Sequence, residues 1–157
     1  MNDQLTHIDE AGAARMVDVS AKDVTSRSAT ASGRVLVSAD VVALLRGAGV
    51  PKGDTLAVAR LAGIMGAQQT PSLIPLCHPL AISGVTVDLV VADDAVEISA
   101  TVRTTDRTGV EMEALTAVAV AGLTVIDMVK AVDKAAVITD VRVEAKSGGK
   151  SGDWVRP

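Results

Sequence analysis

Apolar and polar residues alternate with a period of two on both sides of one short acidic turn, and this pattern constrains the fold more than any other feature of the chain. The alternating segments are residues 82–91 and 96–103, and Asp93 and Asp94 lie between them. Alternation of this length is typical of strands with one buried face. Two such strands joined by a short turn form an antiparallel hairpin. We therefore expect a hairpin in the middle of the chain, with one face exposed to water.

One strand and two helices are predicted before this hairpin. Residues 34–38 are expected to form the first strand. Each of the two helices follows an aspartate in the N-cap position, Asp40 before residues 41–46 and Asp54 before residues 55–69.

A long helix and a last strand are predicted after the hairpin. Thr108 and Glu111 match a capping box that opens a helix running to about residue 131, and residues 137–145 are expected to form a strand. The complete order predicts an α+β chain with the ferredoxin-like split β-α-β-β-α-β fold, in which helices cover one face of an antiparallel sheet.

The length of 157 residues indicates a single domain. Residues 16–19 are expected to be a short extended piece, followed by a polar loop rich in Ser, Thr and Ala over residues 20–33. The expected parts are an N-terminal strand and polar loop (1–33), the ferredoxin-like core (34–145) and a flexible tail rich in Gly and Lys (146–157).

Charge and aromatic content argue against a nucleic-acid partner. The chain has 15 basic and 19 acidic residues, and Trp154 is its single aromatic residue. It therefore lacks both a net positive charge and platforms on which bases could stack.

The remaining composition predicts a cytoplasmic protein that is not a monomer. The nearly uninterrupted apolar stretch over residues 114–126 is shorter than the roughly 20 residues of a membrane span, and the N-terminus does not resemble a signal peptide. Cys77 is the one cysteine, so no internal disulfide can form. The mean hydropathy of +0.36 predicts more apolar surface than one small domain can bury, and hence contacts between subunits.

The loop around Cys77 and His78 is the first candidate for chemistry. Pro75 and Pro79 prevent a regular helix there and fix the backbone. Such a loop could serve proton transfer or ligand binding, but His78 could equally be a histidine satisfied in the core. A metal site is disfavoured, because His7 is the only other histidine.

Several basic residues could meet an anionic ligand. Arg60 lies in an otherwise apolar helix and either forms an internal ion pair or contacts a phosphate. Lys52 could equally be a solvated loop residue, and Lys146 and Lys150 lie on a glycine-rich segment that is either a lid for a polyphosphate or a disordered terminus. A Walker phosphate loop is excluded, because Glu144 occupies the position of its first glycine.

Acidic residues stand at both ends of the predicted long helix. Glu111 and Glu113 open it, while Asp127 and Lys130, which could be a simple surface pair, stand near its end. Glu113 and Asp127 are separated by about 21 Å along a helix. One small ligand could contact both ends only where two subunits meet, which makes a site at an interface plausible.

Five segments, taken together, resemble one family. They are MVDVSAK at 16–22, LIPLCHP at 73–79, TGVEMEALT at 108–116, DMVKA at 127–131 and KSGGKSG at 146–152. The chain is similar over residues 4–153 to the molybdenum cofactor biosynthesis protein C family, whose members are cyclic pyranopterin monophosphate synthases.

The resemblance implies a reaction and an assembly. The reaction is conversion of 3′,8-cyclo-7,8-dihydroguanosine 5′-triphosphate to cyclic pyranopterin monophosphate with release of diphosphate. Separately from the resemblance, no cofactor is assigned, and Mg²⁺ could accompany the triphosphate. The assembly is a homohexamer, a trimer of dimers, with active sites between subunits. The alternative is a nucleotide-binding regulatory module of the same fold without turnover.

The resemblance also implies residue roles. Asp127 is expected to be the catalytic acid and Lys130 its partner. The expected substrate-binding residues are Leu76, Cys77, His78, Met112, Glu113, Glu111, Lys52, Lys146, Asp18, Lys22, Arg27 and Arg60.

Overall fold

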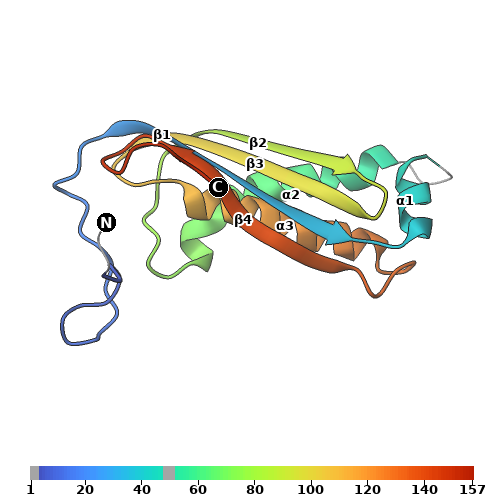
Figure 1. The fold of residues 1–157 in the computed structure, drawn as a ribbon, viewed down its shortest axis with the longest axis horizontal. Coiled ribbons are helices and arrows are strands. Elements are labelled where there is room, and N and C mark those ends of the chain that lie inside the picture. Colours follow the sequence, from blue (N-terminus) through green and yellow to red (C-terminus); the bar gives the residue numbers. More distant parts are fainter. Residues whose placement is uncertain (1–3, 48–51) are drawn as a thin grey trace.

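A five-stranded antiparallel sheet with helices on one face forms the body of the protein (Figure 1). The computed structural model describes residues 4–47 and 52–157, with only the backbone of Lys52. The sheet order is β2-β3-β1-β4-β5, and its first four strands have the arrangement of the predicted ferredoxin-like fold, which is confirmed. The elements are β1 (Thr25–Leu36), α1 (Ala39–Leu45), α2 (Lys52–Leu73), β2 (Ile82–Val91), β3 (Ala95–Asp106), α3 (Glu111–Val129), β4 (Val137–Ser147) and β5 (Trp154–Val155).

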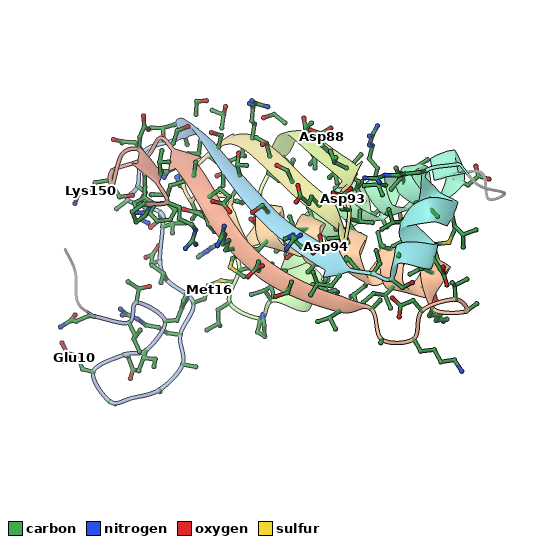
Figure 2. All side chains as sticks on the ribbon, turned by 45° about the vertical axis from the view of Figure 1, so that its right-hand side comes forward. Glu10, Met16, Asp88, Asp93, Asp94 and Lys150 are labelled. Carbon is green, nitrogen blue, oxygen red and sulfur yellow. The ribbon has the colours of Figure 1, made fainter. Side chains whose placement is uncertain are left out.

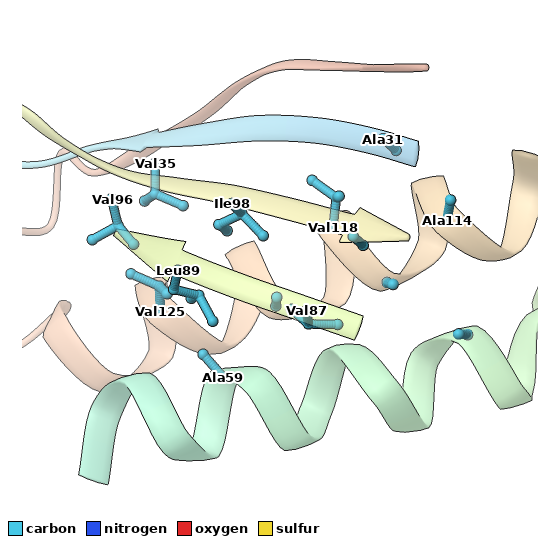
Figure 3. Close-up of a cluster of buried hydrophobic side chains, with 14 of the residues drawn as sticks. Ala31, Val35, Ala59, Val87, Leu89, Val96, Ile98, Ala114, Val118 and Val125 are labelled. Atoms are coloured by element: carbon cyan, nitrogen blue, oxygen red, sulfur yellow. The ribbon is translucent and has the colours of Figure 1, made fainter. Parts of the chain in front are cut away.

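The predicted hairpin is present as β2 and β3. The two strands pair from Val91 opposite Val96 to Ile82 opposite Thr104. Their apolar side chains point toward α2 and α3, where Val87 and other small aliphatic residues form the core (Figure 3). The opposite face is polar and carries residues such as Asp88 (Figure 2).

Glycines on α2 allow it to pack closely against α3. A Cβ on Gly66 would lie 2.9 Å from Val120 Cβ, and one on Gly63 would lie 3.0 Å from the carbonyl oxygen of Ala117. β1 is antiparallel to β3 and β4, and β2 is antiparallel to β3, so α2 between β1 and β2 and α3 between β3 and β4 run in opposite directions. The end of α2 and the start of α3 therefore lie at the same end of the molecule (Figure 1).

The first strand is longer than predicted. β1 begins at Thr25, so most of the expected polar loop over residues 20–33 belongs to the central strand, while residues 16–19 form no strand. Ala29 and Ala31 face the core between half-buried serines and threonines. Small side chains give little contrast in hydropathy, so this alternation is hard to recognise in the sequence.

Three helix boundaries also differ from the prediction. Ser38, and not Asp40, caps α1, since its hydroxyl accepts a hydrogen bond of 3.3 Å from the backbone of Val41. α2 begins before Asp54 and continues past residue 69 to Leu73. The predicted capping box is wrong: Val110 is the N-cap of α3 and offers no side-chain hydrogen bond.

The expected flexible tail folds back on the sheet. β5 pairs with β4, placing Trp154 opposite Lys146, and the Arg156 guanidinium lies 5.6 Å from the Trp154 ring centre. Gly148 and Gly149 adopt positive φ values of 84° and 77° and allow the chain to reverse. The segment from residue 146 is thus part of the sheet edge.

The long helix α3 is more extensively apolar than its 13-residue central stretch suggested. Among the described residues it is the one helix long and apolar enough, by length and composition alone, to cross a membrane. It packs against β1, β3 and β4 and against α2, and half of its 18-residue apolar window is buried, as in the core helix of a folded domain.

Candidate active site

A cavity of about 780 Å³ opens where α2 ends and α3 begins. The chain leaves the helix after Leu73 and turns through Pro75 and Pro79, so Leu76, Cys77 and His78 form an irregular wall next to the start of α3. The described residues lining it are Thr6, His7, Ala14, Val17, Val19, Lys22, Ile74, Pro75, Leu76, Cys77, His78, Thr108, Gly109, Glu111 and Met112.

A buried carboxyl group lies behind this wall. Glu113 is only 1% exposed, and the Cys77 thiol donates a hydrogen bond of 3.5 Å to its Oε1. Its Oε2 has no hydrogen-bond partner in the part of the chain that the structure describes. Burial, with a smaller contribution from the charge of Glu111, raises the pKa of Glu113 and favours the protonated acid. A neutral acid can donate a hydrogen bond, which a carboxylate cannot.

Cys77 is held as a thiol in this environment. Burial raises its pKa to about 11, and the nearby Glu113 adds to the shift. Nucleophilic cysteines have lowered pKa values that yield the thiolate near neutral pH. Cys77 is therefore suited to hydrogen bonding and not to covalent catalysis.

The free energy of unfolding is expected to fall with rising pH as Glu113 ionises. Because its pKa is raised above the ordinary value of about 4.3, the native state holds this proton more tightly than the unfolded chain. The stabilisation that this bound proton provides is complete below the ordinary pKa of a glutamate. It is lost as pH rises through the raised pKa of Glu113. In Glu113→Gln, the melting temperature should vary less between about pH 4 and pH 8 than in the wild type.

Glu10→Gln is the matched control for this experiment, because Glu10 is exposed and distant from the core. Its melting temperature should follow the wild-type pH profile. Parallel profiles for wild type and Glu113→Gln would show that Glu113 does not titrate differently on folding.

Charged groups line the cavity or neighbour residues that line it. Lys146 Nζ lies 3.9 Å from Glu111 Oε1 and also contacts the Ser151 hydroxyl. Thus Glu111 forms an ion pair with Lys146 of β4 and does not complete the predicted capping box. Asp18 accepts a hydrogen bond of 2.9 Å from the backbone of Ser20, and its hydrogen bonds to Ser20 lower its pKa, so it is charged.

Arg27 is oriented by the backbone around it. Its Nε donates a 3.0 Å hydrogen bond to the carbonyl oxygen of Asp106, and its Nη2 donates one of 3.5 Å to that of Asp23. A Cβ on Gly149 would clash with the guanidinium, so glycine at this position lets the loop between β4 and β5 approach Arg27. The loop and the arginine are thereby brought together.

A second group of predicted residues lies at the opposite end of the helix pair. Lys130 Nζ and Asp127 Oδ1 form an ion pair of 2.6 Å near the end of α3, and both side chains are exposed. Arg60, also exposed, belongs to the first half of the antiparallel α2 and lies toward the same end. The side chain of Lys52 falls outside the described residues.

One chain therefore does not bring all the predicted site residues together. Asp127 lies fourteen residues beyond Glu113 on α3, or about 21 Å along the helix. The residues at the Glu113 end are Asp18, Lys22, Arg27, Leu76, Cys77, His78, Glu111, Met112, Glu113 and Lys146.

The sequence interpretation missed the contribution of the N-terminus to the cavity. Thr6, His7 and Ala14 line it, although the interpretation gave them no role in the site. Val17 and Val19 on either side of Asp18 were the available signal, since both are apolar residues within a polar segment. In residues 4–47 and 52–157, no three His, Cys, Asp or Glu side chains gather in a way that could hold a metal ion.

Comparison with known proteins gives a consistent result. Residues 16–149 match the model of the MoaC family. The cyclic pyranopterin monophosphate synthase of Streptomyces coelicolor is 81% identical over 154 residues, covering 98% of this chain and 91% of the relative. The cyclic pyranopterin monophosphate synthase of a Nocardioides species is 78% identical, and the match covers 98% of this chain and 96% of the relative. Cyclic pyranopterin monophosphate synthase 2 of Mycobacterium tuberculosis is 60% identical, covering 98% and 92%.

Proposed function

The chain belongs to the MoaC family, and from this premise we propose that it is a cyclic pyranopterin monophosphate synthase of molybdenum cofactor biosynthesis. It converts 3′,8-cyclo-7,8-dihydroguanosine 5′-triphosphate to cyclic pyranopterin monophosphate and releases diphosphate. The similarity to synthases over nearly the whole chain carries this proposal. The cavity supports it, because apolar walls with a few polar groups suit a nucleotide-derived ring.

The end of the helix pair at which Glu113 lies provides groups for binding this substrate. The loop that carries Cys77 and His78 forms one wall against which the ring would pack, and Glu113 behind it holds this loop through the hydrogen bond from the Cys77 thiol. Lys22, Arg27 and Lys146 can neutralise phosphate oxygens, and a guanidinium can do so through two parallel hydrogen bonds. A Mg²⁺ ion that arrives with the triphosphate would share this task.

The Asp127 end provides the groups for proton transfer. When the cyclic phosphate forms, a sugar hydroxyl attacks the α-phosphorus, its oxygen–phosphorus bond forms, and the bond to the diphosphate breaks. The hydroxyl proton needs an acceptor, and the carboxylate of Asp127 can take it. Lys130, 2.6 Å away, can orient this carboxylate and return a proton in the ring-forming steps. Lys52 and Arg60 would stabilise the negative charge of the leaving diphosphate.

A complete site would require two chains, because its two halves lie at opposite ends of α2 and α3. We place it between subunits of a homohexamer, a trimer of dimers, in the cytoplasm, with no nucleic-acid or membrane partner. Exposed apolar side chains on the helices support contacts between subunits. They are Val58, Leu61, Met65, Leu123 and Met128.

Turnover of the cyclic triphosphate by the purified protein tests the proposed function. We expect stoichiometric release of diphosphate and cyclic pyranopterin monophosphate, detected by mass spectrometry. A regulatory module of the same fold would bind the nucleotide and raise the melting temperature, yet release no diphosphate. That result would contradict the proposal.

A further inference from the structure

The beginning of the chain forms a small structured loop beside the body of the protein. We call residues 4–19 the N-terminal arm; Glu10 lies at its outer turn and Met16 where it returns toward the sheet (Figure 2). Ile8 pairs with Ala14 in an antiparallel bridge. The side chain of Asp9 accepts hydrogen bonds of 2.9 and 2.8 Å from two backbone amides within the turn. The arm therefore has a defined shape of its own.

The arm supplies one side of the cavity. Thr6, His7, Ala14, Val17 and Val19 line it, facing the loop that carries Cys77 and His78. His7 is the titratable side chain among these five, and the proposed reaction gives it no role. Its backbone carbonyl accepts a 2.8 Å hydrogen bond from the amide of Arg15, which anchors His7 within the arm.

One ring nitrogen of His7 contacts the backbone of the arm. Its Nδ1 lies 3.4 Å from the carbonyl oxygen of Arg15. A carbonyl oxygen can only accept, so this contact places the proton of the neutral ring on Nδ1. The lone pair then lies on Nε2, which becomes a hydrogen-bond acceptor.

We propose that His7 is a further substrate-binding residue, and that its Nε2 accepts a hydrogen bond from an N–H or O–H group of the nucleotide-derived substrate. The inference rests on the proposed function. Lys22 also lines the cavity and its ammonium group can only donate hydrogen bonds, so an acceptor on the arm complements it. The arm then forms the outer wall of the substrate site.

Two amide variants separate substrate contact from a merely structural role. In His7→Asn the side-chain amide can replace Nδ1 and keep the contact with Arg15, but nothing replaces Nε2. In His7→Gln the side chain reaches the position of Nε2 and keeps an acceptor there. We expect KM to rise about tenfold in His7→Asn and to stay within about threefold of wild type in His7→Gln, because one hydrogen bond to the substrate is lost or kept.

The control variant is Glu10→Gln, on the same arm but away from the cavity, and its KM should equal that of wild type. Hydrogen exchange of the Arg15 amide reports whether the arm stays folded, and we expect wild-type protection in His7→Asn. An unchanged KM in His7→Asn would overturn the inference. So would an equal rise of KM in both His7 variants together with lost protection of Arg15, because His7 would then only hold the arm. Absence of product with the wild-type protein would instead contradict the proposed function.

Discussion

Replacing Asp127 with asparagine is expected to lower turnover by at least about 10²-fold while changing substrate affinity by less than about threefold. Asparagine keeps the size and most of the hydrogen-bonding capacity of the aspartate but cannot take up a proton. Proton transfer is thus lost, whereas substrate binding depends mainly on groups at the opposite end of the α2–α3 helix pair, near Glu113. Steady-state turnover and calorimetric binding of the cyclic triphosphate measure the two effects separately.

The fold should not change in Asp127→Asn. The ion pair with Lys130 is exposed, and pairs of this kind contribute about 0–1 kcal/mol to stability. The matched control is Asp93→Asn, which breaks an exposed ion pair of 3.1 Å with Arg46 in the hairpin turn and should leave turnover unchanged. Turnover of Asp127→Asn within about threefold of wild type would mean that Asp127 and Lys130 form only a surface pair. Glu113 and His78 would then be the next candidates for proton transfer.

Co-expression of two inactive variants is expected to restore activity if each site takes its two halves from different chains. Asp127→Asn damages one end of the helix pair and Lys146→Ala the other, so each variant alone should have little activity. In a randomly mixed assembly, about a quarter of the sites would receive both intact halves. The measurement is the rate of diphosphate release relative to wild type, and light scattering should give about six times 16.0 kDa.

The control combines Asp127→Asn with Lys130→Ala. Both changes lie at the same end of α3, so every chain in the mixture carries a damaged Asp127–Lys130 half. No activity should therefore return. A monomeric mass, or no recovery with Lys146→Ala, would contradict a site shared between chains.

The element order was predictable because most elements show a clear period. Val87, Val96 and their neighbours are apolar residues in strict alternation, so the hairpin and the fold class follow from the pattern. β1 was only partly recognised, because its buried positions before residue 33 are alanines between Ser and Thr. The strand exists there because β3 and β4 pair with it on both sides. Such long-range pairing is absent from any local window of sequence.

The candidate site was predictable as a set of residues but not as an arrangement. Helical geometry placed Glu113 and Asp127 far apart, and the structure has them toward opposite ends of α3. The raised pKa of Glu113 depends on burial behind Cys77, which only the folded chain creates. His7 was considered only as a metal ligand, because its place in the cavity depends on how the N-terminal arm folds against a loop some seventy residues away.

The proposed sharing of sites between chains also affects how defects combine, because the two halves of the proposed site lie toward opposite ends of one helix pair. With sites shared between chains, each copy of α3 takes part in two sites, one at either end. A chain with inactivating substitutions at both ends of α3 therefore inactivates both sites in which it takes part. In a mixed population of intact and doubly damaged chains, catalytic output would fall with the square of the intact fraction, so a defective allele would act in a partly dominant manner.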